Sequence, residues 1–224
     1  SYFSKTSRLG RVNTGSVAQR LADTPGVART ILGAARAARG MPGADPRAMS
    51  HSWLFTGPPG SGRSLAAIDF AAALMCTDPE EPGCGRCEAC RAVLETKQHT
   101  DLVLVDPQEV IIPVDTVREV IGRAASLPTV APWRVVIFNN ADRLNNNGAN
   151  ALLKTVEEPP ARTVIIMCAP SDAPEDFSQT LRSRCRHLYI PSPSVESITA
   201  QLVSEGASDH DAHLAALTSL RHVG

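Results

Sequence analysis

Four cysteines gather within a short stretch of the sequence. Their spacing is Cys76-x7-Cys84-x2-Cys87-x2-Cys90, with a glycine and two prolines between the first two. Close C-x-x-C spacing lets neighbouring sulfurs converge on one tetrahedral centre, about 2.3 Å from each, which suits structural Zn²⁺. The pattern predicts that all four bind one zinc ion without a catalytic role, because four thiolates leave no open position for water. Free or redox-active thiols are the alternative.

A phosphate-binding loop is indicated by residues 57–64, GPPGSGRS. They match the pattern G-x-x-x-x-G-K-[ST] except at the lysine, and they lie between an apolar run and a predicted helix. Glycines let backbone amides curl around phosphate oxygens, and the helix N-terminus adds positive potential. The candidate phosphate-binding residues are Gly57, Gly60, Gly62, Arg63 and Ser64. Because arginine is longer and planar, it does not replace the lysine, and the loop predicts a fold more strongly than nucleotide chemistry.

Two asparagines, Asn139 and Asn140, follow the apolar run at 134–138. In phosphate-loop ATPases the end of such a strand supplies an aspartate for magnesium and an acidic group for the attacking water. Asparagine keeps a similar shape but carries no negative charge and has no useful basicity. Together with the missing lysine, this predicts that the chain does not hydrolyse ATP by itself.

Three arginines alternate at Arg182, Arg184 and Arg186, just before the apolar run at 187–190. In an extended segment they would point to the same side and form a compact basic edge. A solvated charged rim, or ion pairs with Glu157 and Glu158, is the unremarkable interpretation. Cys185 lies in the same Ser-Arg-Cys triplet, whereas Cys168 lies inside an apolar run and is predicted to be a core residue.

These residues are carried by strands and helices that alternate along the chain. Apolar runs predict strands, and longer segments without a breaker predict helices. The expected strands are 52–55, 102–105, 134–138, 163–168 and 187–190; the expected helices are 17–39 (broken at Pro25-Gly26), 63–75, 115–125 with Asp115 as its N-cap, 148–157, 195–204 and 212–220. This alternation predicts an α/β fold with a mostly parallel sheet covered on both faces.

Composition excludes several classes of protein. The 224 residues are 43% hydrophobic and 20% charged, with a net charge of −1, which is typical of a globular protein and argues against a general binder of polyanions. No apolar run approaches the roughly 20 residues needed to span a bilayer, and no N-terminal signal pattern is present. We expect a soluble cytoplasmic protein.

The order of the motifs resembles that of a known family. After the phosphate loop and the four cysteines come Ile112-Pro-Val-Asp115, then the stretch Asn150-Ala-Leu-Leu-Lys-Thr-Val-Glu-Glu-Pro159, then Ser183-Arg184-Cys185. From Val17 to its C-terminus the chain resembles the clamp-loader subunits of bacterial DNA polymerase III, in the AAA+ superfamily. The gamma/tau motor of that family keeps a lysine in the loop and an Asp-Glu pair at the strand end. The departures therefore favour the delta-prime type.

The resemblance implies a domain organisation. It predicts an AAA+ phosphate-loop domain at 16–190, with a zinc module at 76–90, and the first part of a small helical lid domain at 191–224. We expect the collar domain of the family to be absent from this sequence. Residues 1–15 show no sustained periodicity and are expected to be a tag or a disordered end.

The resemblance also implies roles and partners. The arginine of the Ser-Arg-Cys triplet, here Arg184, would act as a finger in the ATP site of a neighbouring subunit. Partners would be the gamma/tau and delta subunits and, through the complex, the sliding clamp and primed-template DNA, with no membrane. The chain would belong to the DNA polymerase III holoenzyme, a DNA-directed DNA polymerase and nucleotidyltransferase, without an ATPase of its own. Nucleotide binding by the degenerate loop stays open.

Two other functions are compatible with parts of the pattern. An ATP-hydrolysing motor of the gamma/tau type is the first. A zinc-knuckle nucleic-acid-binding regulator is the second, but no aromatic residue for base stacking lies between Phe70 and Trp133. A hydrolase with a nucleophilic side chain is disfavoured, because no Ser/His/Asp or Cys/His arrangement has a supporting motif.

Overall fold

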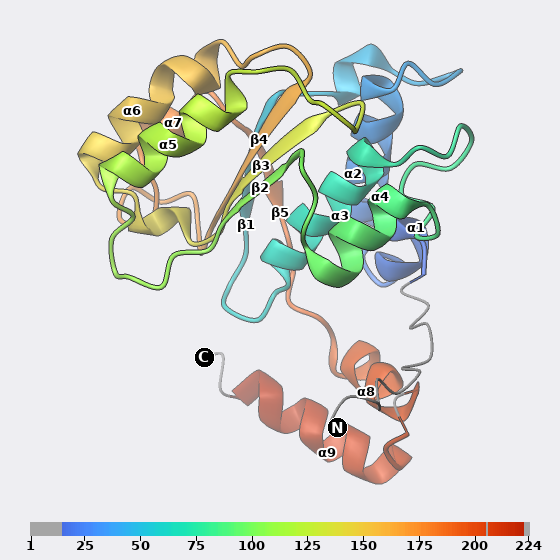
Figure 1. Ribbon diagram of the computed structural model, residues 1–224. Coiled ribbons are helices and arrows are strands. Elements are labelled where there is room, and N and C mark those ends of the chain that lie inside the picture. Colours follow the sequence, from blue (N-terminus) through green and yellow to red (C-terminus); the bar gives the residue numbers. More distant parts are fainter. Residues whose placement is uncertain (1–14, 205, 222–224) are drawn as a thin grey trace, which may run out of the picture.

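A five-stranded parallel sheet forms the centre of the molecule (Figure 1). The structure is a computed structural model that describes residues 15–204 and 206–221. The strands are β1 (Ser52–Thr56), β2 (Leu102–Val105), β3 (Arg134–Phe138), β4 (Thr163–Ala169) and β5 (Arg186–Tyr189), in the order β2-β3-β4-β1-β5. Every residue of β1, β3 and β4 is buried, as expected where helices cover both faces.

Helices cover the sheet on two sides (Figure 1). One side carries α1 (Val17–Arg20), α2 (Pro25–Ala38), α3 (Arg63–Met75) and α4 (Glu88–Arg91), which continues into the short π-helical turn η2 (Ala92–Thr96); the other carries α5 (Val114–Ala124), α6 (Asn146–Glu157) and α7 (Gln179–Arg182). Two further short turns are η1 (Pro46–Ala48) and η3 (Ala141–Arg143). The α/β class with a parallel sheet is therefore confirmed.

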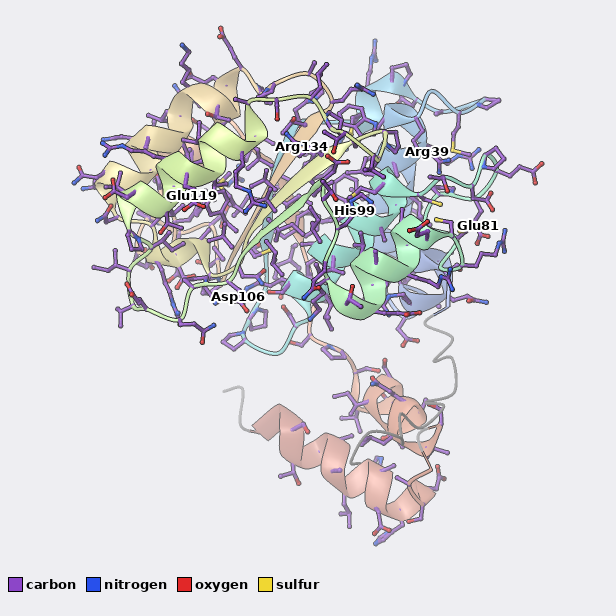
Figure 2. The ribbon with its side chains drawn as sticks, in the orientation of Figure 1. Arg39, Glu81, His99, Asp106, Glu119 and Arg134 are labelled. Atoms are coloured by element: carbon purple, nitrogen blue, oxygen red, sulfur yellow. The ribbon has the colours of Figure 1, made fainter. Side chains whose placement is uncertain are left out.

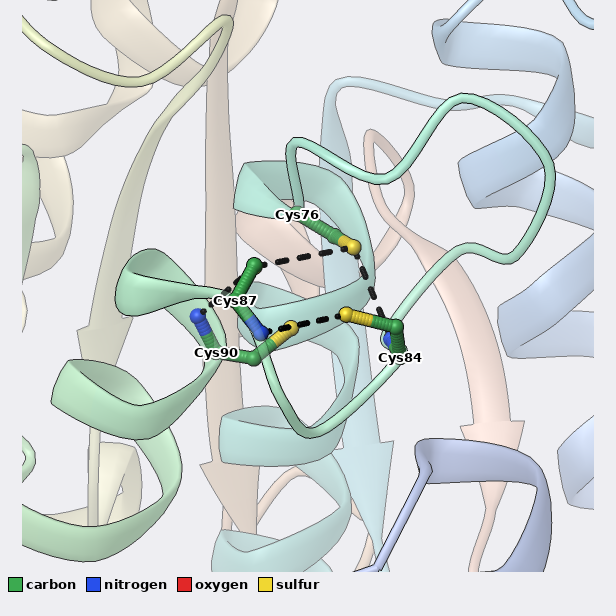
Figure 3. Close-up of side chains that lie close together, drawn as sticks. All are labelled: Cys76, Cys84, Cys87 and Cys90. Atoms are coloured by element: carbon green, nitrogen blue, oxygen red, sulfur yellow. Dashed lines mark hydrogen bonds between the residues drawn. The ribbon is translucent and has the colours of Figure 1, made fainter.

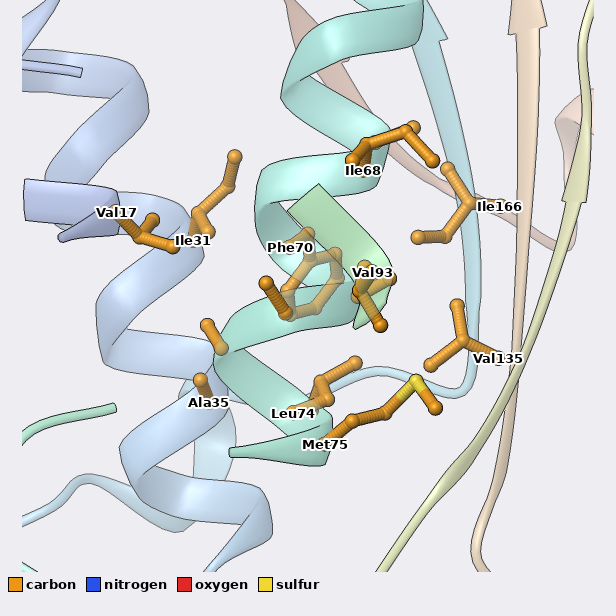
Figure 4. Close-up of a cluster of buried hydrophobic side chains, with 14 of the residues drawn as sticks. Val17, Ile31, Ala35, Ile68, Phe70, Leu74, Met75, Val93, Val135 and Ile166 are labelled. Carbon is orange, nitrogen blue, oxygen red and sulfur yellow. The ribbon is translucent and has the colours of Figure 1, made fainter. Parts of the chain in front are cut away.

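The two apolar cores follow from the alternation of side chains along the strands. On β1, Trp53 and Phe55 face the core beneath α2 and α3, whereas Leu54 faces the core beneath α5 and α6. In the first core Phe70 of α3 lies near Trp53, with ring centroids 5.2 Å apart. Figure 4 shows Phe70 in the same cluster as Ile31 of α2 and Val135 of β3. The helix that follows the phosphate loop is thus fixed to the middle of the sheet.

Two helices, α8 (Val195–Ser204) and α9 (Asp209–Arg221), form a separate small unit beside the sheet domain (Figure 1). Ser197 on α8 donates a hydrogen bond to Asp23 in the turn between α1 and α2, at 2.7 Å. The predicted helices at 195–204 and 212–220 are confirmed, the second starting earlier. None of the described helices is both long and apolar enough to cross a membrane.

Some predicted boundaries are wrong for local reasons. The helix expected to be capped by Asp115 begins at Val114, with Pro113 as its N-cap and Asp115 in its first turn. The helix expected from Gly148 begins at Asn146, because the side chain of Asn145 accepts a hydrogen bond from the Gly148 N–H at 2.9 Å. The expectation for residues 1–15 falls, apart from Gly15, outside the described residues.

Candidate functional site

The four clustered cysteines come from three elements that meet at the end of α3 (Figure 3). Cys76 is the C-cap of α3, Cys84 lies in the following loop, Cys87 is the N-cap of α4, and Cys90 lies within α4. Their sulfur atoms all lie within 4.8 Å of one another, and those of Cys76 and Cys87 are 3.9 Å apart. A tetrahedral zinc ion with bonds of about 2.3 Å separates its sulfurs by roughly 3.8 Å. The geometry therefore fits a metal ion bound by four thiolates.

Backbone amides already point at these sulfurs. The N–H groups of Asp78 and Cys84 donate to Cys76 at 3.4 and 3.5 Å, and that of Cys87 donates to Cys84 at 3.3 Å. A hydrogen bond from the Cys90 thiol lowers the pKa of Cys76 to about 4, and the same shared proton raises the pKa of Cys90. These donors stabilise the thiolate of Cys76, the form in which cysteine binds a metal, whereas burial raises the pKa of Cys84.

The cysteine loop is packed tightly against the first described residues of the chain. The N–H of Val17 donates to the carbonyl of Gly83 at 2.8 Å. Gly85 has a φ of +74°, and a Cβ there would lie 2.0 Å from the carbonyl oxygen of Gly15. Only glycine fits such a backbone approach. The cluster thus joins α1, α3 and α4 in one place.

The phosphate loop connects β1 to α3 and has the expected backbone shape. Gly60 and Gly62 adopt φ values of +81° and +83°, and Gly62 is the N-cap of α3. A Cβ on Gly57 would lie 2.4 Å from the carbonyl oxygen of Ile190. The side chain of Arg63 folds back, and its Nη1 donates to the carbonyl of Gly57 at 2.5 Å. In the described chain this guanidinium therefore spans the loop and bonds to its backbone.

The two asparagines lie at the carboxyl end of β3. The N–H of Asn139 donates to the carbonyl of Val105 at 2.8 Å, which continues the pairing of β3 with β2. Its side-chain oxygen Oδ1 is buried and has no hydrogen-bond partner in the described part of the chain. Asn140 has a φ of +51°, which asparagine tolerates better than most residues. In a parallel sheet the carboxyl ends of the strands all lie on the same side. Both asparagines therefore lie at the same end of the sheet as the phosphate loop, which follows β1.

A cavity of about 420 Å³ lies over the phosphate loop, between the sheet domain and α8. It is lined by Ser61 of the loop, by Asp23 and Thr24 from the turn before α2, and by residues 191–194 and 196–197. The hydroxyl of Ser61 is buried and has no hydrogen-bond partner among the described residues. The cavity is lined by small polar side chains and by the carboxylates of Asp23 and Glu196, and β3 contributes no acidic residue to it.

The predicted basic edge of alternating arginines is wrong. Arg182 ends α7 and Ser183 continues its turn, so the segment is helical rather than extended before β5 begins at Arg186. Arg182 pairs with Asp172 at 3.0 Å, and Arg186 lies 5.0 Å from the ring centroid of Trp53. The three side chains therefore have separate partners.

Arg184 lies in the turn between α7 and β5. Its Nε donates to the carboxylate of Glu157 at the end of α6, and its Nη1 donates to the carbonyl of Thr180 at 2.7 Å. Its side chain is 36% exposed, so it lies at the surface. The ion pair with Glu157 was one of the two alternatives weighed for this residue, and it is present in the free chain.

The remaining cysteines, Cys168 and Cys185, are buried in the two cores. Burial raises the pKa of both thiols to about 12, so neither is a reactive thiolate near neutral pH. The prediction that Cys168 is a core residue is confirmed. Within the Ser-Arg-Cys triplet only the first two side chains face outward, because Cys185 packs into the core that contains Leu181.

Two polar networks were missed by the sequence analysis. His187 Nε2 lies 2.5 Å from the hydroxyl of Thr56 at the end of β1, and its Nδ1 lies 3.6 Å from Asp172. Burial lowers the pKa of His187, although Asp172 opposes this shift. Asp101 and Arg134 form a buried ion pair at 3.1 Å. A lone acidic residue directly before an apolar strand was the one available signal for the second network.

Comparison of the sequence with family models and curated proteins matches the chain to subunits of DNA polymerase III. The family whose sequence model is described as "DNA polymerase III, delta subunit" matches residues 44–194. The chain is 35% identical, over 165 residues, to "DNA polymerase III subunit delta'" of Pseudomonas aeruginosa, a match that covers 70% of this chain and 49% of that protein. It is 33% identical, over 166 residues, to "DNA polymerase III subunit gamma/tau" of Mycobacterium tuberculosis, covering 72% and 28%. The chain spans about half the length of the delta-prime relatives it matches.

A solved structure supports the fold. The Thermotoga maritima RuvB Holliday junction branch migration motor superposes with a TM-score of 0.52 over 86% of this chain and 55% of that one. The two sequences are 16% identical, so this likeness concerns the fold alone. The superposition supports the fold of a parallel sheet covered by helices on two sides.

Proposed function

Because the chain belongs to the DNA polymerase III delta-subunit family, we propose that it is part of a delta-prime-type, non-motor subunit of the clamp loader. In this proposal it assembles with gamma/tau and delta subunits in the cytoplasm. The complex then helps to load the sliding clamp on primed DNA. In it, the sheet domain would be the AAA+ domain, and the unit formed by α8 and α9 would belong to the lid domain.

One observation supports a non-motor subunit over a motor. At the carboxyl end of β3, next to the phosphate loop, stand Asn139 and Asn140, where ATP hydrolysis needs acidic groups. The buried Oδ1 of Asn139, to which no described residue donates a hydrogen bond, is neutral, so it supplies neither charge for magnesium nor a base for water. Arg63 is bonded to the loop's own carbonyl at Gly57. An ATP-hydrolysing motor subunit is the second candidate function, because the chain is also 33% identical to a gamma/tau subunit.

We assign to Arg184 the role of a finger acting in trans on the ATP site of a neighbouring subunit. Its ion pair with Glu157 lies at the surface, where such pairs contribute ~0–1 kcal/mol. A weak pair of this kind is readily exchanged for the γ-phosphate of a neighbour, to which a guanidinium presents a rigid fork of donors. A finger supplied in trans is worth about 10³–10⁵ in rate in GTPases.

The cysteine cluster is assigned to one structural zinc ion. The donor set is all sulfur, the spacing of the sulfurs fits a tetrahedral ion, and three of the four cysteines are buried. When bound, the ion would fix the junction of α1, α3 and α4. It would take no part in ATP chemistry.

The experiment uses the full-length protein reconstituted with the gamma/tau and delta subunits. Arg184→Ala should leave folding, zinc content and assembly intact and should lower DNA-stimulated ATPase and clamp loading at least about tenfold. Arg118→Ala is the matched control, because Arg118 is an exposed arginine paired with Asp115 on α5. Normal clamp loading by Arg184→Ala would leave it as a rim residue, and failure of the wild-type chain to co-purify with gamma/tau and delta would remove the clamp-loader proposal itself.

A further inference from the structure

The two edges of the sheet differ in their protection. The strand order places β2 at one edge and β5 at the other. On β5, Arg186 and His187 carry polar side chains, and charged residues discourage an edge strand from pairing with another chain. Every residue of β2 is aliphatic, in the order Leu-Val-Leu-Val, and Leu104 is half-buried while the other three are buried. The β2 edge thus lacks the usual protection by charged residues.

Alternate residues of β2 direct their backbone N–H and C=O groups away from β3, the one neighbouring strand in the described sheet. The N–H of Val135 donates to the carbonyl of Asp101 at 3.0 Å, and the N–H of Asn139 donates to that of Val105 at 2.8 Å. Because bonding groups alternate along a parallel pair, the N–H and C=O of Leu104 point outward, away from β3. Among the described residues no loop bonds to the Leu104 backbone. An outward donor and acceptor of this kind can pair with an added strand.

A cavity lies on each face of this edge. The first, of about 930 Å³, lies on the side of Leu102 and Leu104; the second, of about 370 Å³, lies on the side of Val103 and Val105. Figure 2 shows His99, which lines the first cavity, and Glu119, which lines the second, on opposite sides of β2. A strand added to β2 would direct its side chains alternately into the two cavities.

The two cavities select different side chains. Lys97, His99 and Arg123 line the first, with Glu88 as its one carboxylate, so it favours acidic side chains. Arg123 also borders the second cavity, whereas Lys97 and His99 line the first one. The second has an aliphatic floor that includes Ile112. Exposed aliphatic residues stand at both rims, with Val130 70% exposed at the first and Ile111 51% exposed at the second; Asp106, Glu109 and Glu119 border the second cavity and disfavour acids there.

The rim of the first cavity is held in place by the buried ion pair. The carboxylate of Asp101 accepts hydrogen bonds from the N–H groups of Thr129, Val130 and Ala131, at 2.7 to 2.8 Å. Arg134, its partner, also donates to the carbonyl of Arg123 at 2.8 Å and so fixes the end of α5. Binding there requires little ordering of the protein, which favours affinity.

We propose that the β2 edge binds an extended segment of a partner protein by strand addition, with acidic side chains in the first cavity and aliphatic side chains in the second. Main-chain hydrogen bonds to Leu104 supply affinity, and the two cavities supply specificity. The surface uses neither the phosphate loop nor Arg184, so it stands or fails independently of the clamp-loader assignment.

The test uses the whole chain and a short acetylated peptide amide in which glutamate and valine alternate. Binding is followed by fluorescence anisotropy and by NMR shifts of β2 amides. N-methylation of one alternate set of peptide residues should abolish binding, whereas methylation of the other set should leave it, because only one set faces β2. Equal effects of the two methylations would overturn strand addition, as would absence of wild-type binding at about millimolar peptide.

Variants of the protein test the cavity assignment. Arg123→Glu should weaken binding at least about tenfold, and so should replacement of the peptide glutamates by lysine. Arg118→Glu, on the same helix but lining neither cavity, should bind like the wild type, with circular dichroism confirming that both variants fold. Equal affinities of the Arg123 and Arg118 variants for the peptide would contradict the claim that the first cavity selects acidic side chains, and so the proposed chemistry of the partner.

Discussion

The two ends of helix α3 carry two sites that differ in how complete their side-chain chemistry is. At its N-terminus, Gly62 ends a phosphate loop whose backbone shape is intact but whose charged groups are replaced. At its C-terminus, Cys76 belongs to a cluster in which all four sulfurs are placed for a metal ion. The difference separates what a fold needs from what a reaction needs. The backbone shape of the loop is held by the segments packed against it, whereas a reaction also needs charged side chains that this loop lacks.

The helix between the two sites explains why both ends keep their shape. Ten of its thirteen residues are buried, from Ala66 to Met75, so α3 cannot shift without opening the core. Close-packed interiors transmit such shifts as strain. The loop before α3 and the cluster after it are therefore both parts of its anchorage, whatever chemistry each retains.

Loss of one cysteine at the C-terminal end should have the largest effect. Cys87→Ser removes one thiolate from the four and leaves a poorer ligand. We expect metal content to fall well below one equivalent and the free energy of unfolding to fall by about 3 kcal/mol or more, part of the ~10–16 kcal/mol that structural zinc contributes in small peptides. Metal analysis by mass spectrometry and urea unfolding measure the two quantities.

Cys168→Ala is the matched control for this variant. It removes a buried thiol that lies outside the cluster, so it should cost ~1 kcal/mol or less and leave the metal content unchanged. Wild-type protein that holds less than a third of an equivalent after purification without chelator would contradict the zinc assignment.

At the N-terminal end, a methyl group on the loop should disturb the fold rather than any chemistry. In Gly57→Ala the new Cβ would meet the carbonyl oxygen of Ile190 at 2.4 Å and the hydroxyl of Ser61 at 2.5 Å. Overpacking of this kind costs about 1–3 kcal/mol, measured as a lower midpoint in urea. Gly122→Ala, on the open face of α5 with nothing near its Cβ, should instead stabilise by ~0.5–1 kcal/mol. Equal stabilities of the two variants would show that the loop is not part of the anchorage.

Much of this comparison could be read from the sequence, because both sites depend on local spacing. The limits of α3 are those predicted, since Gly62 and the cysteine spacing mark its two ends. The four sulfurs converge as the C-x-x-C spacing predicts. Strands were found because fully buried parallel strands are continuous apolar runs.

What escaped prediction depends on contacts between distant segments. The hydrogen bond from Arg63 back to the carbonyl of Gly57 and the contact of His187 with Thr56 are set by tertiary geometry. The turn formed by α7 overrode the apparent alternation of the arginines, because Ser178 caps a short helix through the N–H of Leu181. A period of two over five residues did not distinguish a strand from a helical turn followed by a strand.

The smallest expected effect on stability comes from Arg63→Lys. It breaks one hydrogen bond of a half-buried side chain, so the free energy of unfolding should change by less than ~1 kcal/mol. Lysine restores a slim point charge for terminal phosphates, yet Asn139 and Asn140 still lack the charges for magnesium and water. We therefore expect release of phosphate from ATP to stay at background in both the wild type and this variant.

Adding Asn139→Asp and Asn140→Glu should give magnesium-dependent stabilisation by ATP, seen as a rise in Tm that scales with ligand concentration. Wild-type turnover near the ~1–100 s⁻¹ of phosphoryl-transfer kinases would contradict the inactive-loop interpretation. Stabilisation of the wild type by ATP without turnover would instead sharpen it, because the loop would then bind through its backbone alone.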